Sequence, residues 1–432
     1  MFVVFSVYIN QMSFMYQRFS KNRILQLLED FRIVYLTGPR QAGKSTLAMS
    51  IGRETGLAYH TLDDAALLLA ARTDPQGLLA ALPVPMVLDE FQLAPELIRA
   101  VKQVSDSAGP VKKSLFLLTG SADVFKSAKT QEALPGHMAR VELLPLSQGE
   151  IHGNRLGCLD WLFEKELPVN IGKALDRNTI ANTLIHGGYP EIQSKSPRSR
   201  SAWFASYVSG RLLKDFETMY DAKGDYYSKL DALIRYLAGL SGNLVKYAAI
   251  SGDLRQDDKT VKRYMEVLEL MFILHRLNPY VRNTAKRGVV GMPKLHFLDT
   301  GLACHLLGQN KPSTLHTSRF YGALLETLVV TEFFKQAVWA EDDYRFWHFR
   351  DRAGNEVDMV VENSAGEVVG VEVKASSTIK LEDFRGLAHL TDYAREKMHR
   401  GVIFYSGANL LPVRVAGHTF HAVPLGYLGV MG

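Results

Sequence analysis

The stretch Gly38-Pro39-Arg40-Gln41-Ala42-Gly43-Lys44-Ser45-Thr46 fits the pattern G-x-x-x-x-G-K-[ST] and decides the fold around it. The apolar run at residues 33–37 predicts a buried strand before this stretch, and residues 45–48 open a helix behind it. The two glycines allow a loop whose backbone N–H groups surround a triphosphate at a helix N-terminus. We expect Lys44 to reach the β- and γ-phosphates and Ser45 to place its hydroxyl on Mg²⁺. The stretch therefore predicts a site for ATP and Mg²⁺ with these nucleotide-binding residues: Gly38, Arg40, Gly43, Lys44, Ser45 and Thr46.

An acidic pair ends a later strand of the same region. Residues 86–88 form an apolar run that leads into Asp89-Glu90. Alone, such a pair is a solvated strand end, but downstream of Lys44 and Ser45 it predicts the second half of a P-loop ATPase. We expect Asp89 to order Mg²⁺ through its water shell and Glu90 to act as general base on the attacking water. The predicted catalytic residues of this site are therefore Lys44 and Glu90.

Hydroxyl groups follow a third strand, residues 114–118. Thr119 or Ser121 would contribute to the nucleotide site by holding the water between Glu90 and the γ-phosphate. Alternatively, either residue would cap the next helix. Further strands at residues 59–62 and 139–144 alternate with helical segments such as residues 63–72. This alternation predicts an α/β fold with a parallel sheet and a ligand at the carboxyl ends of its strands.

Composition sets the class of protein. The chain has 432 residues, which predicts more than one domain, and a net charge of +5, which leans toward anionic partners. Cys158 and Cys304 lie far apart, as suits a reducing cytosol, so we expect a cytoplasmic protein. Residues 1–11 are apolar but too short to span a bilayer and lack the features of a secretory signal. No other stretch approaches membrane length, so we expect no membrane partner.

Further motifs carry a resemblance to a known family. Beside the loop at residue 38, the chain has L-D-E-F-Q at 88–92, L-T-G-S-A at 118–122 and L-P-L-S-Q-G-E at 144–150. Together with G-G-Y-P-E at 187–191 and P-K-L-H-F-L-D-T-G-L-A at 293–303, these resemble bacterial and archaeal AAA-type ATPases that carry a C-terminal domain of unknown function. The resemblance implies an AAA-type core with an N-terminal extension over residues 1–175 and a helical lid over 176–222.

The chain departs from this family at two places. It has Gly136-His137 where the family usually has Gly-Arg, and Lys214-Asp215 where the family often has Arg-Asp. The arginine finger that such ATPases use is therefore not identified, and we take Arg140 and Arg211 as candidates. Because many such ATPases complete their sites between subunits, a homo-oligomer is expected.

Residues 223–307 predict a winged helix-turn-helix. Helical patterns at 226–240, 244–251 and 258–270 precede strands at 273–277 and 295–298, which flank the basic segment 282–288. On the third helix Lys259, Lys262 and Arg263 lie opposite an apolar face. Such a helix enters the major groove of DNA while the wing contacts phosphates, which favours nucleic acid as a partner, DNA more than RNA. Alternatively, the domain only relays the nucleotide state by packing.

Past a hinge expected at residues 308–318, residues 308–432 resemble a restriction-endonuclease-like α/β domain. A helix at 320–334 carries Glu326, and strands at 356–361 and 368–374 carry Asp358 and Glu372-x-Lys374. We expect Glu326, Asp358 and Glu372 to hold Mg²⁺ through hard oxygen ligands. Lys374 would orient a water or stabilise charge on phosphorus, so Asp358, Glu372 and Lys374 are predicted catalytic residues.

These parts predict an α/β multidomain protein that binds and hydrolyses ATP and acts on nucleic acid, with a Mg²⁺-dependent nuclease domain at its end. Nuclease-like folds often lose cleavage and keep binding. The alternative is therefore an ATP-controlled signalling or assembly switch, whose C-terminal domain binds a partner without cutting it.

Overall fold

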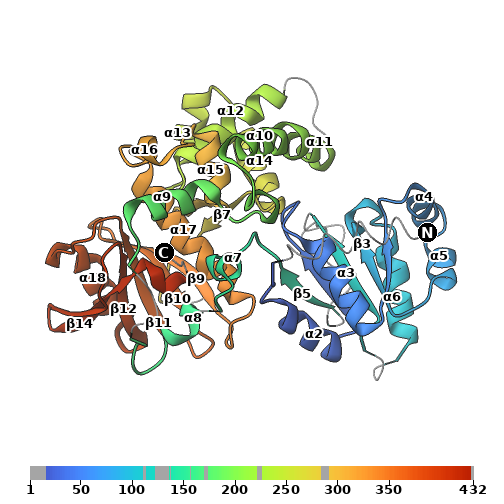
Figure 1. The fold of residues 1–432 in the computed structure, drawn as a ribbon, viewed down its shortest axis with the longest axis horizontal. Coiled ribbons are helices and arrows are strands. Elements are labelled where there is room, and N and C mark those ends of the chain that lie inside the picture. Colours follow the sequence, from blue (N-terminus) through green and yellow to red (C-terminus); the bar gives the residue numbers. More distant parts are fainter. Residues whose placement is uncertain are drawn as a thin grey trace.

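The computed structural model describes residues 16–109, 113–121, 136, 138–155, 157–169, 174–220, 226–283 and 291–429. Predictions made for residues 1–11, for His137 and for most of the basic segment 282–288 fall outside these ranges. Within them, no helix is both long and apolar enough to cross a membrane. Figure 1 shows the N-terminal part of the chain at the right, the C-terminal sheet at the lower left, and the helices α9 to α16 above that sheet.

A parallel sheet of five strands organises the N-terminal part, in the order β2-β3-β4-β1-β5. This result confirms the parallel sheet that the sequence predicts. β4 pairs with β1 on one side and with β3 on the other. The carboxyl end of β4 therefore lies between the loop that follows β1 and the acidic pair that follows β3. The strands are β1 (Ile33–Thr37), β2 (Ala58–Thr61), β3 (Met86–Asp89), β4 (Phe116–Gly120) and β5 (Met138–Glu142).

Helices cover both faces of this sheet because successive strand residues point to opposite sides. On one face, α2 (Lys21–Asp30) and α3 (Lys44–Thr55) pack against Val34 and Leu117. On the other face, α4 (Ala65–Thr73), α5 (Pro75–Ala81) and α6 (Leu97–Ser107) pack against residues such as Leu118. The sheet is thus buried on both sides, and only its strand ends are open to a ligand.

A mostly helical region follows the parallel sheet. It begins with α7 (Gln148–His152) and α8 (Cys158–Trp161), and the predicted lid comprises α9 (Arg177–His186), α10 (Pro197–Tyr207), a π-helical turn (Val208–Leu212) and α11 (Leu213–Tyr220). Next come α12 (Tyr226–Gly239), α13 (Tyr247–Leu254) and α14 (Asp258–Leu270). The short strands β6 (Asn243–Leu244), β7 (Leu274–Leu277) and β8 (Lys294–Phe297) join in an antiparallel sheet of order β6-β8-β7.

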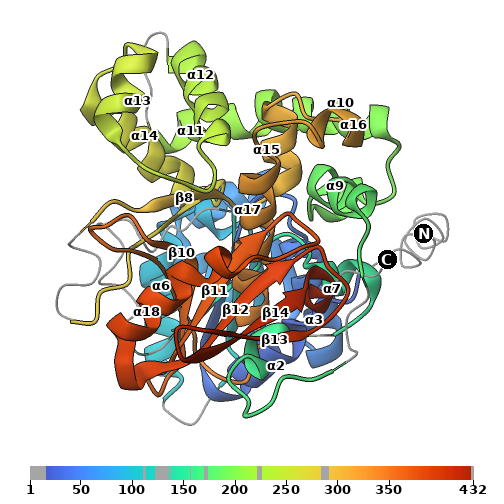
Figure 2. The ribbon, with the colours of Figure 1, turned by 90° about the vertical axis from the view of Figure 1, so that its left-hand side faces the viewer.

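The C-terminal part is built on a mixed sheet of six strands, in the order β13-β14-β12-β11-β10-β9. Its first strands form an antiparallel meander, and β12 then adds in parallel to β11. α17 (Tyr321–Ala337) packs on one face of this sheet and α18 (Arg385–Ala394) packs on the other. In Figure 2, α18 lies in front of the sheet. The strands are β9 (Arg345–Arg350), β10 (Glu356–Glu362), β11 (Val368–Lys374), β12 (Met398–Tyr405), β13 (Leu411–Val415) and β14 (His418–Pro424).

The hinge expected at residues 308–318 is a packed segment instead. It contains α16 (Pro312–Leu315), whose Leu315 is fully buried, and it follows directly on α15 (Thr300–Leu306). Arg177 donates to the backbone oxygen of His316. One hydrophobic core runs from Cys158 to Leu428 across this segment. A Ser/Thr/Pro-rich composition predicted a hinge here, but tertiary packing decided otherwise.

Candidate functional site

The loop between β1 and α3 has the backbone that a phosphate-binding loop needs. Gly38 and Gly43 have φ of +151° and +94°, and a Cβ at Gly38 would overlap the backbone oxygen of Leu143. Lys44 is buried, and its Nζ donates to the backbone oxygens of Gly38 and Pro39 at 2.9 and 2.7 Å. Burial lowers the pKa of Lys44 to about 8, although Glu90 and Asp89 act in the opposite direction. The loop thus holds Lys44 over its own carbonyls, next to the carboxylates.

Asp89 is the centre of the hydrogen-bond network at the strand ends. Its carboxylate accepts hydrogen bonds from Ser45 Oγ at 3.1 Å, from Tyr59 Oη at 2.6 Å and from Thr119 Oγ1. The structure therefore brings together Lys44, Ser45, Asp89 and Thr119, as the sequence predicts. Tyr59 is a contributor that the sequence analysis missed, because it lies on β2, which carries no motif.

Glu90 is held by an amide that the sequence analysis did not assign. Gln92 Nε2 donates to Glu90 Oε2 and, at 3.0 Å, to Ser121 Oγ, while Gln92 Oε1 accepts from the backbone N–H of Ser121. Glu90 also has a positive φ of +57°, and its side chain makes no capping hydrogen bond to the 3-10 helix that it precedes. Ser121 thus contacts Glu90 through Gln92, and the backbone N–H of Glu90 donates to Thr119 Oγ1 at 3.2 Å.

The remaining predicted residues lie at the rim of this site. Arg40 pairs with Asp215 of α11, so the loop and the lid are joined by an ion pair. Thr46 is exposed on α3. Among the arginine-finger candidates, Arg140 pairs with Glu142 at 2.6 Å on the edge strand β5, and Arg211 is exposed in the π-helical turn.

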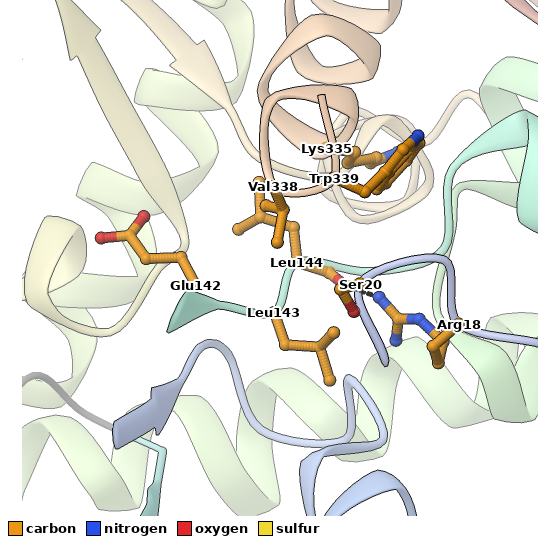
Figure 3. Close-up of a pocket in the computed structure, with 8 residues that line it drawn as sticks. All are labelled: Arg18, Ser20, Glu142, Leu143, Leu144, Lys335, Val338 and Trp339. Carbon is orange, nitrogen blue, oxygen red and sulfur yellow. Dashed lines mark hydrogen bonds between the residues drawn. The ribbon is translucent and has the colours of Figure 1, made fainter. Parts of the chain in front are cut away.

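The motif at residues 144–150 joins the N-terminal part to the C-terminal helix α17. Ser147 and Glu150 form a capping box for α7, and Glu150 accepts from Arg18 Nε at 3.0 Å. The backbone N–H of Gln148 donates to buried Glu332 of α17 at 2.9 Å. A cavity of about 10 Å³ remains beside this contact, with Arg18 on one side and Lys335 on the other (Figure 3). It has room for about one water, so it is a packing defect rather than a ligand site.

Two more motifs meet at Asp299. Asp299 caps α15 by accepting from the backbone N–H of Leu302 at 2.8 Å, and it accepts from that of Gly188 at 2.7 Å. The backbone oxygen of Gly188 in turn accepts from Leu146 at 2.7 Å. A Cβ at Gly187, whose φ is +64°, would overlap the Asp299 carboxylate, which explains the glycine. The three motifs around Leu146, Gly188 and Asp299 therefore form one junction.

The C-terminal residues predicted from sequence also converge. Asp358 Oδ2 accepts from the backbone N–H of Val373 at 3.0 Å, and Glu372 Oε2 accepts from that of Asp358 at 3.4 Å, so the two carboxylates cross between β10 and β11. Lys374 Nζ donates to Glu372 Oε1 at 3.0 Å. Glu326 on α17 faces this cluster from the neighbouring layer.

An unpredicted cation, Lys294 of β8, lies inside this carboxylate cluster. Its Nζ is 2.6 Å from Glu326 Oε1 and 2.9 Å from Asp358 Oδ1. Burial would raise the pKa of Asp358, but Lys294 holds it below its usual value. Burial and Asp358 raise the pKa values of Glu326 and Glu372 above their usual range. The cluster thus places the ammonium groups of Lys294 and Lys374 among its three carboxyl groups.

The carboxylates of this cluster are not arranged as a set of ligands for the expected metal. In the described part of the chain, no three His, Cys, Asp or Glu side chains are grouped so that they could hold a metal ion. Between Glu326 and Asp358 the structure has Lys294 instead of an open gap. The magnesium site at Glu326, Asp358 and Glu372 therefore stays a prediction, and Lys294 is the residue that it omitted.

Three family models match successive parts of the chain. Residues 30–152 match the family model of an AAA domain. Residues 177–313 and 321–428 match two different domains of unknown function. Because the first match covers the phosphate loop and the acidic pair, the N-terminal part is an AAA-type P-loop ATPase domain of the kind that binds ATP with Mg²⁺.

Relatives and solved structures are distant. Uncharacterized proteins of Mycobacterium tuberculosis and Mycobacterium bovis are each 28% identical over 404 residues, or 93% of this chain and 82% of theirs. A Walker-type ATPase of Pyrococcus abyssi is 15% identical, with a TM-score of 0.42 over 66% of this chain and 94% of that one. The RuvB Holliday junction branch migration motor of Thermotoga maritima is 17% identical, with a TM-score of 0.30 over 60% and 88%. Both TM-scores lie below 0.5, so these two likenesses carry no conclusion about this chain.

Proposed function

We propose that this chain hydrolyses ATP at the strand ends of the parallel sheet and uses the nucleotide state to act on nucleic acid. The observation that carries the first half is the network around Asp89, which gathers Ser45 and Thr119 beside Lys44. Lys44 would turn from its loop carbonyls to the β- and γ-phosphates. A bound Mg²⁺ would supply charge neutralisation there. Glu90 would take a proton from the attacking water once Gln92 releases it.

Two substitutions separate binding from hydrolysis. Lys44→Ala should weaken ATP binding at least tenfold, because the charge that meets the phosphates is lost. Glu90→Gln should leave the Kd within about twofold and lower kcat by roughly 10²- to 10⁴-fold, since only the proton transfer is removed. Glu266→Gln, at an exposed glutamate of α14, is the matched control. Equal loss of binding in both variants would contradict these roles.

Action on nucleic acid is supported by the region from α12 to β8. Three helices and a three-stranded antiparallel sheet follow one another as a winged helix-turn-helix requires, and Lys259 and Lys262 are exposed on its third helix, α14. Asp257 caps that helix by accepting from the backbone N–H of Thr260. DNA is the favoured partner because a helix with lysines on its exposed face fits the major groove.

A salt series tests this contact. Changing Lys259 and Lys262 together to Ala should weaken binding of duplex DNA and reduce the slope of log K against log salt by roughly 1.8, since two fewer counterions are released. Changing the exposed Lys165 and Lys311 together is the control with the same loss of charge. If the two double variants weaken DNA binding and change the salt slope equally, α14 makes no specific contact with DNA. The domain then relays the nucleotide state as part of a switch.

A second candidate function is metal-dependent cleavage by the C-terminal domain. Its support is the convergence of Asp358, Glu372 and Lys374 on a helix–meander–helix–strand arrangement, which is the order of a restriction-endonuclease-like core. Asp358→Asn should abolish Mg²⁺-dependent cutting of linear or branched DNA and leave ATP hydrolysis near wild type. No cutting by the wild-type chain, with or without ATP, would leave a partner-binding module.

A further inference from the structure

Lys294 is supplied to the C-terminal cluster by another part of the fold. It lies on β8, in the three-stranded sheet, whereas Asp358 lies on β10 of the six-stranded sheet, 64 positions along the chain. The side chain of Lys294 is 7% exposed, and those of Glu326 and Asp358 are 12% and 14% exposed. The ammonium group is therefore enclosed together with the two carboxylates that it contacts.

The neighbourhood of β8 fixes this arrangement. His296, two residues on and so on the same face of β8, has its Nε2 3.6 Å from Glu326 Oε1, and its Nδ1 is 3.3 Å from Thr327 Oγ1. The backbone oxygen of Met292 contacts His348 Nε2 of β9 at 3.0 Å. These contacts hold β8 beside the carboxylate cluster. The position of Lys294 in the cluster therefore follows from the packing of the two sheets and not from the rotation of a surface side chain.

Lys294 and a divalent ion would compete for the same oxygens. A buried carboxylate pair needs a positive charge between its members, and only one cation can occupy that position. Among the described residues no set of three ligands is ready for a metal, which agrees with a cluster arranged around an ammonium group. A divalent ion would also need the carboxylates to turn toward it.

We propose that Lys294 is the resident cation of the C-terminal carboxylate cluster and keeps it closed to divalent ions as long as its ammonium group lies between Glu326 and Asp358. The inference rests on the cleavage function proposed above, since it names what regulates that site. The region from α12 to β8, which carries the exposed lysines of α14, would then control metal binding by the C-terminal domain.

Mn²⁺ binding to the full, nucleotide-free chain tests the proposal, with bound and free Mn²⁺ distinguished by electron paramagnetic resonance. Lys294→Met should create one site with a Kd at least tenfold tighter than any in the wild type. Adding Asp358→Asn to that variant should remove the site. Lys294→Arg keeps the charge and should behave like the wild type. An Asp358-dependent site of equal affinity in the wild type, or no new site in Lys294→Met, would overturn the proposal.

A second variant protects the test against misfolding, because Lys294→Met leaves two carboxylates without their cation. Lys294→Met/Glu326→Gln removes one charge of each sign, and it should also gain a Mn²⁺ site through Asp358 and Glu372. Absence of that site in the folded double variant contradicts the proposal. A nuclease assay on the same proteins separates the two ideas. If Lys294→Met binds Mn²⁺ but does not cut DNA, closure by Lys294 is supported and the cleavage function is refuted. If the wild type binds Mn²⁺ as tightly as Lys294→Met and cuts DNA, the cleavage function is supported and closure by Lys294 is refuted.

Discussion

At the scale of single residues, the nucleotide site depends on hydrogen bonds that satisfy its charged side chains before any ligand binds. Lys44 bonds to carbonyls of its own loop, and Asp89 accepts three hydroxyl groups. Glu90 is likewise held by Gln92. The bonds of Lys44 and Asp89 satisfy buried polar groups, and we expect them to be exchanged when phosphates arrive. The site is therefore closed by local hydrogen bonds rather than by a lid alone.

The lowered pKa of Lys44 gives this site a pH dependence. With a pKa of about 8 in the free protein, Lys44 loses its proton as the pH rises above 8, whereas bound phosphates keep it protonated. ATP affinity should therefore be full below pH 8 and fall by roughly tenfold per pH unit above it, as one proton is taken up on binding. Calorimetry in buffers of different ionisation enthalpy measures that uptake.

Lys44→Arg is the control for this pH dependence. A guanidinium group stays charged throughout this range, so the variant should take up no proton when ATP binds. An association constant for the wild type that stays level from pH 7 to 9.5 would show that Lys44 remains charged in the free protein, and that its burial is compensated by the neighbouring carboxylates.

At the scale of elements, the junction around Asp299 shows how loops and helix ends fix the lid. Asp299 caps α15 and binds the backbone N–H of Gly188, while Gly188 binds Leu146 in the segment before α7. Three segments that are far apart in the sequence are thus joined to one another by hydrogen bonds of their backbone groups. Since Asp299 is only 4% exposed, loss of any one of these contacts would leave a buried polar group without a partner.

Two glycines with similar positive φ test this junction. Gly187 and Gly308 have φ of +64° and +68°, but only at Gly187 would a Cβ overlap the Asp299 carboxylate, and at Gly308 nothing lies within 4 Å. Gly308→Ala should cost about 1–2 kcal/mol, the strain of a left-handed backbone. Gly187→Ala should cost more than that, because a ψ of −162° at this positive φ is essentially restricted to glycine and because the cap is displaced as well. A thermal shift should therefore be clearly larger for Gly187→Ala; equal shifts would show that the junction yields without cost.

At the scale of the whole molecule, the parallel sheet has its own cores, another core runs from Cys158 to Leu428, and a further core lies under α18 of the C-terminal sheet. The lid, the region from α12 to β8 and the C-terminal sheet are therefore expected to move as a unit relative to the parallel sheet. Contacts between the two parts include the ion pair of Arg40 with Asp215, the bond of Gln148 to Glu332 and a small core of Leu144, Phe272 and Leu298. The first of these contacts begins in the phosphate loop itself.

Nucleotide binding should therefore change the hydrogen exchange of the amides in α11. Phosphates near Arg40 would compete with Asp215 for its guanidinium group, so a non-hydrolysable ATP analogue should change hydrogen exchange of the amides in α11 (Leu213–Tyr220) at least severalfold. Asp215→Asn should reduce this response and keep nucleotide affinity within a few-fold of wild type. Asp231→Asn, which breaks the exposed pair with Arg235, is the control. Unchanged exchange at α11 in the wild type would place the signal elsewhere.

The sequence by itself determined what depends on neighbours along the chain. The glycines of the phosphate loop, the strand at Ile33–Thr37 and the acidic pair Asp89-Glu90 all follow from local spacing, and strand alternation placed Glu372 and Lys374 on one face. The parallel sheet then brought Lys44, Asp89 and Thr119 together, because the carboxyl ends of its strands meet at one edge. Those parts of the site are predictable from the amino-acid sequence alone, since each depends on a local pattern or on the general geometry of parallel sheets.

Only the tertiary structure decided which distant side chains complete these sites. Tyr59 and Gln92 reach the acidic pair, and Asp299 reaches Gly188 across 111 positions. Lys294 enters the carboxylate cluster from another sheet, and the expected hinge at residues 308–318 became part of a continuous core. A lysine on a short strand, or a segment rich in Ser, Thr and Pro, has no local pattern that names its partner. Burial and charge balance select that partner only once the sheets have docked, because an unpaired charge inside the packed chain would be too costly.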